Sequence, residues 1–284
     1  MARVLIAGCG YVGRTLAAEL AGDGHSVWGL SRSPDALPRD VTPLAADLCA
    51  PESLAGLPPS LDAVAYLAAP SGSDDDRYRR TYVEGLSNLL RALDQQGQVP
   101  ARAIFVSSTA VYAQADGEWV DEDSPTEPAH FSGRRLLEAE AVLHCAPSAT
   151  TVVRFGGIYG PGRTRLIESV RSGRAVYRDA PPQFTNRIHR DDCAGVLRHL
   201  LFAADVAEVY VGVDCDPARD ADVQRFLAAE LDASPPRAVS ADDPALRSAR
   251  GNKRCRNDRL VASGYTFRYP TYREGYRAVI RGMD

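Results

Sequence analysis

The chain has 284 residues, of which 45% are hydrophobic and 25% are charged, and its formal net charge is -4. This length can bury a full α/β core with one small additional domain. The negative charge argues against a nucleic-acid-binding surface, and no apolar run reaches the roughly 20 residues that a membrane span needs. The N-terminal apolar run is short and lacks a signal-peptide pattern, so the sequence predicts a cytoplasmic protein.

Two residue counts restrict the chemistry. The six cysteines are scattered without a C-x-x-C pair, which favours reduced thiols over a disulfide framework or a zinc site. We therefore expect no metal. Of the 33 basic residues only Lys253 is a lysine, so any mechanism that needs a lysine must use Lys253.

Strand and helix patterns alternate through the first half of the chain. A short apolar run over residues 4–7 predicts the first strand, and a helical pattern follows directly. Repeated alternation with short connections predicts a Rossmann-type α/β fold with a doubly wound, mostly parallel sheet. We expect further strands at 24–30, 41–46, 62–67, 103–106 and 151–155, and helices at 75–95 and 132–145.

The pattern changes after Gly160-Pro161-Gly162, where short elements are interrupted by proline pairs. We expect a dinucleotide-binding domain over residues 1–160 and a smaller C-terminal substrate-binding lid over 161–183 and 214–284. Between them, strands are expected at 184–188 and 208–213 with a helix at 191–203. These segments near 184–213 are expected to return to the first domain.

The motif with the clearest chemistry is Gly8-Cys9-Gly10-Tyr11-Val12-Gly13, which has G-x-G-x-x-G spacing between the first strand and the first helix. In a dinucleotide site the first glycine permits a tight turn, the second lets backbone approach a pyrophosphate, and the third lets the helix pack closely on the sheet. The N–H groups at the helix N-terminus face the phosphates. We therefore expect Gly8, Gly10, Tyr11, Val12 and Gly13 to bind a dinucleotide.

The end of the second strand indicates which dinucleotide. NAD-binding folds place an acidic residue there to bind the ribose hydroxyls, but this chain has Ser31-Arg32-Ser33. A guanidinium beside hydroxyl groups suits a 2′-phosphate. We therefore predict NADP, with NAD remaining an alternative because Arg32 could also stack on adenine.

Several stretches together resemble the extended short-chain dehydrogenases/reductases of the NAD-dependent epimerase/dehydratase group, nearly from end to end. They are Ala46-Asp47-Leu48, Leu67-Ala68-Ala69, the helix from Tyr82 to Leu90, Val106-Ser107-Ser108-Thr109-Ala110-Val111-Tyr112, the turn from Arg154 to Gly162, and Ile188-His189-Arg190-Asp191-Asp192. The segment from Asn252 to Tyr272 resembles an atypical, uncharacterised subgroup.

The resemblance implies several site residues. Asp47 and Leu48 would contact adenine, Leu67, Ala68 and Ala69 would lie beside the cofactor, and Ser108 would occupy the family's catalytic Ser/Thr position. It also implies hydride transfer to or from a small polar or sugar-linked substrate, and a homodimer formed through the helices at 75–95 and 132–145.

The family's catalytic Tyr-x-x-x-Lys pair is absent. In the family a glutamate follows four residues after the lysine. The nearest match here places His130 and Arg134 at the pair and Glu138 after them, whereas a registration through Glu140 places Ser132 and Leu136 there.

His130 and Arg134 have both a chemical and a structural interpretation. Histidine can pass a proton near neutral pH, and arginine can bond ribose hydroxyls, so His130 and Arg134 could act with Ser108. Alternatively, His130 caps the helix that begins near Ser132, and Arg134 lies on a solvated face.

Two function hypotheses follow. The first is an NAD(P)-dependent oxidoreductase or epimerase-like enzyme, with Arg163, Arg187 and His189 contacting substrate. The second is a catalytically degenerate NADP(H)-binding protein that acts as a redox sensor or partner scaffold, which the missing Tyr-Lys pair motivates.

Overall fold

The protein is described here from a computed structural model that covers residues 1–244, 246 and 251–283. The chain divides into two compact units. The first unit comprises Met1–Val111, Glu127–Arg154 and Cys193–Tyr210. The second unit comprises Tyr112–Thr126, Phe155–Asp192 and Val211–Asp284. Residues 112–126 therefore cluster with the C-terminal segments, although they precede two segments of the first unit in the sequence.

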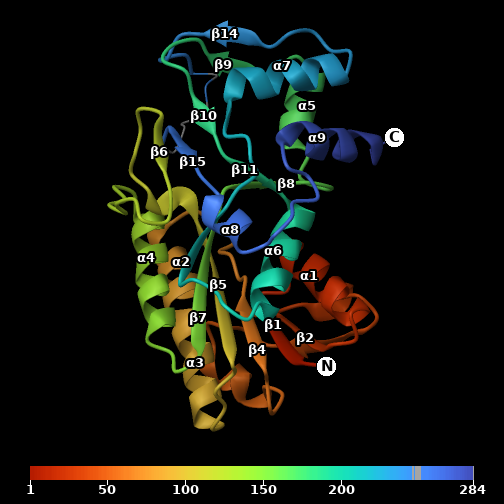
Figure 1. The fold of residues 1–284 in the computed structure, drawn as a ribbon, viewed down its shortest axis with the longest axis vertical. Coiled ribbons are helices and arrows are strands. Elements are labelled where there is room, and N and C mark those ends of the chain that lie inside the picture. Colours follow the sequence, from red (N-terminus) through yellow and green to blue (C-terminus); the bar gives the residue numbers. More distant parts are fainter. Residues whose placement is uncertain (245, 247–250, 284) are drawn as a thin grey trace. The chain divides into compact units, whose positions relative to one another are not determined.

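The largest sheet has seven strands in the order β12-β7-β5-β4-β1-β2-β3 (Figure 1). The pairs β3–β2, β2–β1, β1–β4 and β4–β5 are all parallel. This is the Rossmann-type fold that the sequence predicts, with strand order reversing between β1 and β4. The strands are β1 (Arg3–Ala7), β2 (Ser26–Ser31), β3 (Val41–Ala45), β4 (Ala63–Tyr66), β5 (Arg102–Ser108), β7 (Ala149–Phe155) and β12 (Val209–Gly212).

The inner strands are buried on both faces, as parallel strands between two helical layers must be. In β1 the side chains of Val4 to Ala7 are all fully buried. Helices α3 (Gly85–Gln95) and α4 (Phe131–His144) pack against each other beside the sheet, and α1 (Tyr11–Gly22) lies on its opposite side (Figure 1). The helices expected at 132–145 and 191–203 are confirmed as α4 and α6 (Arg190–Phe202).

The helix expected over residues 75–95 is present but not uniform. It consists of α2 (Asp75–Tyr78), a π-helical segment η3 (Arg79–Glu84) and α3. The hydroxyl of Tyr66 donates a hydrogen bond to the carbonyl of Thr81 inside the π segment, and a Cβ on Gly85 would lie only 2.5 Å from that hydroxyl. A side chain that inserts into the helical ladder in this way widens it locally.

The second unit is built from short strand pairs and helices around its own core. The strand pairs are β8 (Gly157–Tyr159) with β11 (Arg187–His189), β9 (Val176–Arg178) with β14 (Arg237–Val239), β10 (Phe184–Thr185) with β13 (Ala218–Arg219), and β6 (Glu118–Val120) with β15 (Lys253–Cys255). The helices are α5 (Arg165–Arg171), α7 (Asp220–Glu230), α8 (Asp258–Ala262) and α9 (Tyr272–Arg281). The core includes Ile167, Val223, Leu227, Tyr272 and Val279.

The segments near 184–213 divide between the two units. The strand expected at 184–188 is two strands, β10 and β11, and both pair within the second unit. The strand expected at 208–213 is confirmed as β12 and joins the large sheet. Across the part of the chain that the structure describes, no helix is both long and apolar enough to cross a membrane.

Candidate cofactor and catalytic site

The glycine motif lies where the strand order of the large sheet reverses. Gly8 follows β1, and Leu67-Ala68-Ala69 follows the neighbouring strand β4. The amide of Leu67 donates to the carbonyl of Ala7 over 2.7 Å, which continues the strand pairing to the carboxyl edge. Ligands of open α/β sheets bind at this edge and at this reversal. The structure therefore brings together the glycine motif and the strand-end motif, which are about 60 residues apart in the sequence.

The surroundings that a Cβ would meet differ at each glycine of the motif. Gly8 has a φ of 89°, and a Cβ there would lie 2.3 Å from the backbone nitrogen of Ala68. A Cβ on Gly13 would lie 3.1 Å from the carbonyl oxygen of Gly8 and 3.2 Å from Ile6. At Gly10 the nearest atom would be the Gly8 oxygen at 3.9 Å. The fold therefore requires glycine at position 8 and crowds position 13, whereas the space at Gly10 is open to a ligand.

The N-terminus of α1 carries no compensating side chain. Its N-cap is Gly10, no side chain accepts a hydrogen bond at the cap, and the first turn, which begins with Tyr11 and Val12, has no acidic residue. The amides of Gly8 and Cys9 both donate to the carbonyl of Leu30, over 3.0 Å and 2.9 Å, and so fix the loop against β2. The positive end of the helix dipole is thus available to a phosphate group.

The end of β2 offers a hydroxyl and a guanidinium. The Oγ of Ser31 is buried and has no hydrogen-bond partner among the described residues, and Arg32 is exposed. A buried hydroxyl without a partner costs free energy unless a ligand or water bonds it. These two groups therefore fit a ribose that carries a 2′-phosphate. Together with the open loop at Gly10, they fit a phosphorylated dinucleotide.

The adenine-side loop is held by its own hydrogen bonds. The carboxylate of Asp47 accepts from the amide of Cys49 over 2.9 Å, and the amide of Asp47 donates to Ser53 Oγ over 2.9 Å. The carbonyl of Leu48 accepts from Asn88 on α3 over 2.9 Å. The loop is therefore fixed in place before any ligand binds.

The candidate catalytic groups lie at β5 and at the start of α4. Ser108 is the last residue of β5, and its Oγ accepts from the amide of Ala110 over 3.2 Å. His130 is the N-cap of α4: its Nδ1 lies 3.3 Å from the amide of Ser132 and 2.9 Å from Ser132 Oγ. Arg134 donates to the carbonyl of Ala129 over 2.5 Å. His130 and Arg134 thus both bond to backbone at the start of their own helix, the arrangement that the capping interpretation predicts.

The two candidate glutamates of α4 differ sharply in burial. Glu138 is on the surface and pairs with Arg135 over 2.9 Å. Glu140 is buried and bonds both Arg154, over 2.7 Å, and Ser107, over 2.5 Å. Arg154 is the first residue of the family-like turn motif, so the registration through Glu140 uses a glutamate that contacts a second family-like stretch. That registration puts Ser132, which contacts His130, at the tyrosine position and Leu136 at the lysine position.

Sequence reasoning missed this buried cluster of Ser107, Glu140 and Arg154. A signal was present, because Glu140 and Arg154 both lie in stretches that resemble family motifs. Helical periodicity separates the two glutamates, because Glu140 lies at helical spacing with the buried Leu136 and Leu143, whereas Glu138 lies on the exposed face.

The three expected substrate residues lie in the second unit. Arg187, whose side chain is 11% exposed, pairs with Asp220 over 3.4 Å and also donates to Thr185. Arg163 is bridged to Gly160 through backbone, with its amide 2.9 Å from that carbonyl. Both therefore already make contacts within this unit.

His189 lies in an aromatic cluster of the second unit. Its ring centroid is 5.3 Å from that of Tyr159 and 4.2 Å from that of Tyr269. Burial lowers the pKa of His189 to about 4, against the opposing effect of Asp191. Its Nε2 is buried and meets no hydrogen-bond partner within the described ranges. His189 is thus a neutral imidazole held in the core of this unit.

Lys253, the single lysine, is also in the second unit. It is 5% exposed, and its Nζ donates to the carbonyl of Tyr112 over 3.1 Å. Burial lowers the pKa of its ammonium group. Among the residues with described positions, no group of three or more His, Cys, Asp or Glu side chains is arranged to hold a metal ion.

Comparison with known proteins identifies the family to which this chain is similar. Residues 4–213 match the family model described as "NAD dependent epimerase/dehydratase family". The chain is 30% identical over 238 residues to Protein YeeZ of Escherichia coli K12, covering 78% of this chain and 81% of that protein. It is 39% identical to a NAD-dependent epimerase/dehydratase from Methylobacillus flagellatus, with a TM-score of 0.81 and coverage of 99% and 98%.

A further solved structure is similar in fold. The human epimerase family protein SDR39U1, crystallised with NADPH, has a TM-score of 0.81 and 24% sequence identity, with coverage of 98% of this chain and 99% of that one. At this identity the similarity establishes the fold alone.

Proposed function

Because the chain belongs to the NAD dependent epimerase/dehydratase family, we propose that it binds NADP(H) in its first unit and transfers hydride to or from a small polar or sugar-linked substrate. The observation that carries the proposal is the open space at Gly10 directly in front of an uncapped helix N-terminus. A pyrophosphate approaching that backbone meets no Cβ and gains the positive end of the helix dipole.

The preference for NADP over NAD rests on Ser31 and Arg32. The Ser31 hydroxyl, which is buried and has no partner among the residues that the structure describes, and the exposed Arg32 guanidinium stand where NAD-selective sites place a carboxylate. A structural relative, human SDR39U1, carries NADPH in its crystal structure, which supports the same choice. When bound, the nicotinamide supplies the hydride acceptor or donor.

The remaining catalytic work falls to Ser108, His130 and Ser132. Ser108 at the end of β5 offers a hydroxyl that can polarise a substrate carbonyl. His130 and Ser132, 2.9 Å apart through Nδ1 and Oγ, form a hydroxyl–imidazole pair that can pass a proton to the substrate oxygen. Arg134 supplies a fixed positive charge on the same turn but exchanges no proton.

A second function has its own support. His130 and Arg134 are bonded to backbone at the start of α4, and the registration through Glu140 leaves Leu136 at the lysine position. A non-catalytic NADP(H)-binding protein could act as a redox sensor or partner scaffold. Such a protein would need Gly10 and Arg32 for binding but would not need a catalytic pair.

The enzyme is expected to act in the cytoplasm as a homodimer through the helices at 75–95 and 132–145. The π-helical segment η3 and α4 contact each other within one chain, so a partner would meet a surface already ordered. Light scattering coupled to size-exclusion chromatography tests the dimer, and a monomer at micromolar concentration would contradict it.

One experiment separates the two functions. NADPH oxidation is followed across a panel of carbonyl compounds and nucleotide sugars, with wild type, Ser108→Ala, His130→Ala and the matched control His144→Ala at the other end of α4. Hydride transfer predicts a turned-over substrate whose kcat falls at least tenfold in Ser108→Ala and His130→Ala only. Unchanged turnover in both variants contradicts the mechanism, and tight NADPH binding without turnover across the panel supports the non-catalytic function.

A further inference from the structure

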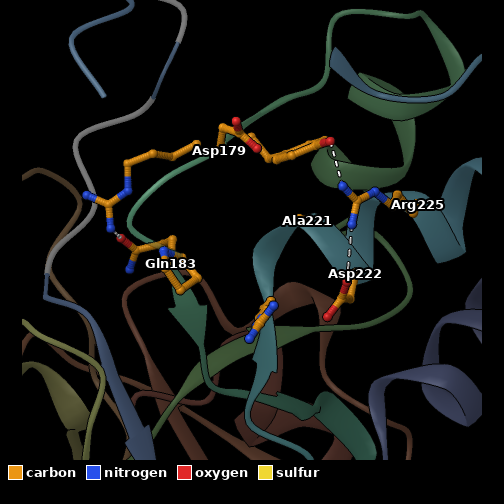
Figure 2. Close-up of a pocket in the computed structure, with 9 residues that line it drawn as sticks. Asp179, Gln183, Ala221, Asp222 and Arg225 are labelled. Atoms are coloured by element: carbon orange, nitrogen blue, oxygen red, sulfur yellow. Dashed lines mark hydrogen bonds and ion pairs between the residues drawn. The ribbon is translucent and has the colours of Figure 1, made fainter. Parts of the chain in front are cut away.

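The second unit contains a cavity of about 150 Å³ that none of the sequence motifs explains. It is enclosed by β9, the loop that follows it and the start of α7. Figure 2 shows Asp179, Gln183, Asp222 and Arg225 arranged around the opening. Its wall also carries Arg178 and Arg219, so three guanidinium groups surround a small space.

Arg178 lines the cavity and has a donor without an acceptor among the described residues. Its Nε is buried and has no hydrogen-bond partner in the described part of the chain, while its Nη2 donates to Gln183 Oε1 over 3.0 Å. The amide nitrogen of Gln183 in turn donates to the carbonyl of Gly251 over 2.8 Å. Gln183 therefore fixes the guanidinium of Arg178, and a buried N–H of that group lacks an acceptor, which costs free energy until a ligand or water supplies one.

The other two arginines differ in how far their charges are balanced. Arg225 donates to Tyr177 over 2.7 Å and pairs with Asp222 over 3.4 Å, and dashed lines in Figure 2 mark both contacts. Arg219 is exposed and contacts the ring of Phe184 at 6.0 Å; among the described residues no carboxylate lies within ion-pair distance of it. The charge of Arg219 is therefore available.

The start of α7 brings backbone N–H groups to the cavity, and its first turn also carries the carboxylates of Asp220 and Asp222. This helix has 11 residues and begins at Asp220, its N-cap is Arg219, and no side chain accepts a hydrogen bond at the cap. Ala221 and Asp222 of its first turn line the cavity. The N–H groups of a first turn favour an anion.

Charge and size together select the ligand. Among the residues that line the cavity, three arginines face two carboxylates, Asp179 and Asp222, which leaves one positive charge in excess. Asp220, in the first turn of α7, pairs with Arg187. A volume of about 150 Å³ accommodates a phosphate or a short carboxylate. Arginine binds both groups through paired hydrogen bonds.

We propose that this cavity binds a small oxyanion, either a phosphate group or the carboxylates of a small metabolite. The cavity belongs to the second unit, and binding there needs none of the residues of the dinucleotide site in the first unit. Arg178 and Arg219 are the principal donors, and Gln183 orients Arg178.

The test is isothermal titration of the full chain with inorganic phosphate and, in a second arm, with malonate. We expect wild type to bind at least one of them, and Arg178→Gln and Arg219→Gln each to weaken it at least tenfold. Arg171→Gln, an exposed arginine on α5 away from the cavity, and Arg32→Gln in the first unit should change the affinity less than twofold. The arm that binds identifies the anion as phosphate or carboxylate.

Three results would overturn the proposal. They are the absence of binding to both anions at 10 mM, an undiminished affinity in Arg219→Gln, and loss of binding in Arg32→Gln. Thermal unfolding without ligand shows whether Arg178→Gln remains folded; if it does not, Arg219→Gln decides, because that side chain is exposed. NADPH affinity is measured on the same samples, so failure here is distinguishable from failure of the proposed cofactor function.

Discussion

The carboxylate of Glu140 and the guanidinium of Arg154 form a buried ion pair with an Oε2–Nη2 distance of 2.7 Å and side chains that are 6% and 7% exposed. A second contact joins Arg154 Nε to Glu140 Oε1 over 3.1 Å. Ser107, the residue before Ser108, donates to the same carboxylate oxygen. This cluster ties α4 to β5 and β7, and it fixes the backbone directly preceding the candidate catalytic serine.

Glu140→Gln should destabilise the protein by about 3–5 kcal/mol, because it leaves the Arg154 charge buried without a counter-ion. Glu138→Gln breaks a similar pair on the surface, where Arg135 stays hydrated, and should cost less than about 1 kcal/mol. Urea unfolding of both variants measures the difference. Equal costs for the two substitutions would show that the buried pair is not an essential part of the core.

Arg32→Gln should weaken NADPH binding by about tenfold to a hundredfold, since a charge-assisted phosphate contact contributes about 1.5–3 kcal/mol. NADH affinity should change by less than threefold, because NADH lacks the 2′-phosphate. Fluorescence titration with both cofactors measures this, and Arg39→Gln, another exposed arginine of the first unit, is the control. A parallel loss of NADH binding would indicate that Arg32 stacks on adenine instead.

His189 should make stability depend on pH below 6.5. Its folded pKa of about 4 lies below the ordinary value of 6.5. Between pH 4 and pH 6.5, the imidazole is therefore protonated in the unfolded chain and neutral in the folded chain. Stability from this group is therefore fully present above pH 6.5 and is lost as the pH falls toward 4, with about 2 kcal/mol lost between pH 7 and 5.

The variant His189→Gln removes this titration. The stability difference between wild type and His189→Gln should shrink by about 2 kcal/mol from pH 7 to 5, measured by urea unfolding at each pH. His144→Gln, which replaces an exposed histidine, is unfolded under the same conditions as the comparison substitution. A constant difference for His189→Gln would mean that His189 is not neutralised by burial.

Much of the first unit could be predicted from sequence because its signals are local. The buried run in β1, the glycines of the following turn and the apolar spacing of α1 and α3 each depend on neighbouring residues, and the resulting strands and helices are confirmed within a few positions. The π segment could not be predicted, because it depends on a long-range contact: the hydroxyl of Tyr66 in β4 donates to the carbonyl of Thr81 in the helix.

The second unit and the catalytic positions required packing information. Residues 184–189 read as one strand, but β10 pairs with β13 and β11 pairs with β8, partners that are distant in sequence. Similarly, helical spacing places Glu140 on the buried face of α4, but its partner Arg154 comes from another element and could not be predicted from that spacing. The cavity at Arg178 depends on the loop before β10 meeting the start of α7, which no sequence period indicates.

The most direct test of the account is the NADPH affinity of Gly10→Ala. A Cβ at this position would come no closer than 3.9 Å to the atoms around it, so the folded protein should accommodate alanine without a steric clash. The methyl group would stand where the pyrophosphate must approach. We predict that Gly10→Ala remains folded, as thermal unfolding will show, and binds NADPH at least tenfold more weakly, while Gly22→Ala, at the other end of α1 with no atom within 4 Å, binds normally. Unchanged NADPH affinity in a folded Gly10→Ala protein would contradict a dinucleotide site at this loop.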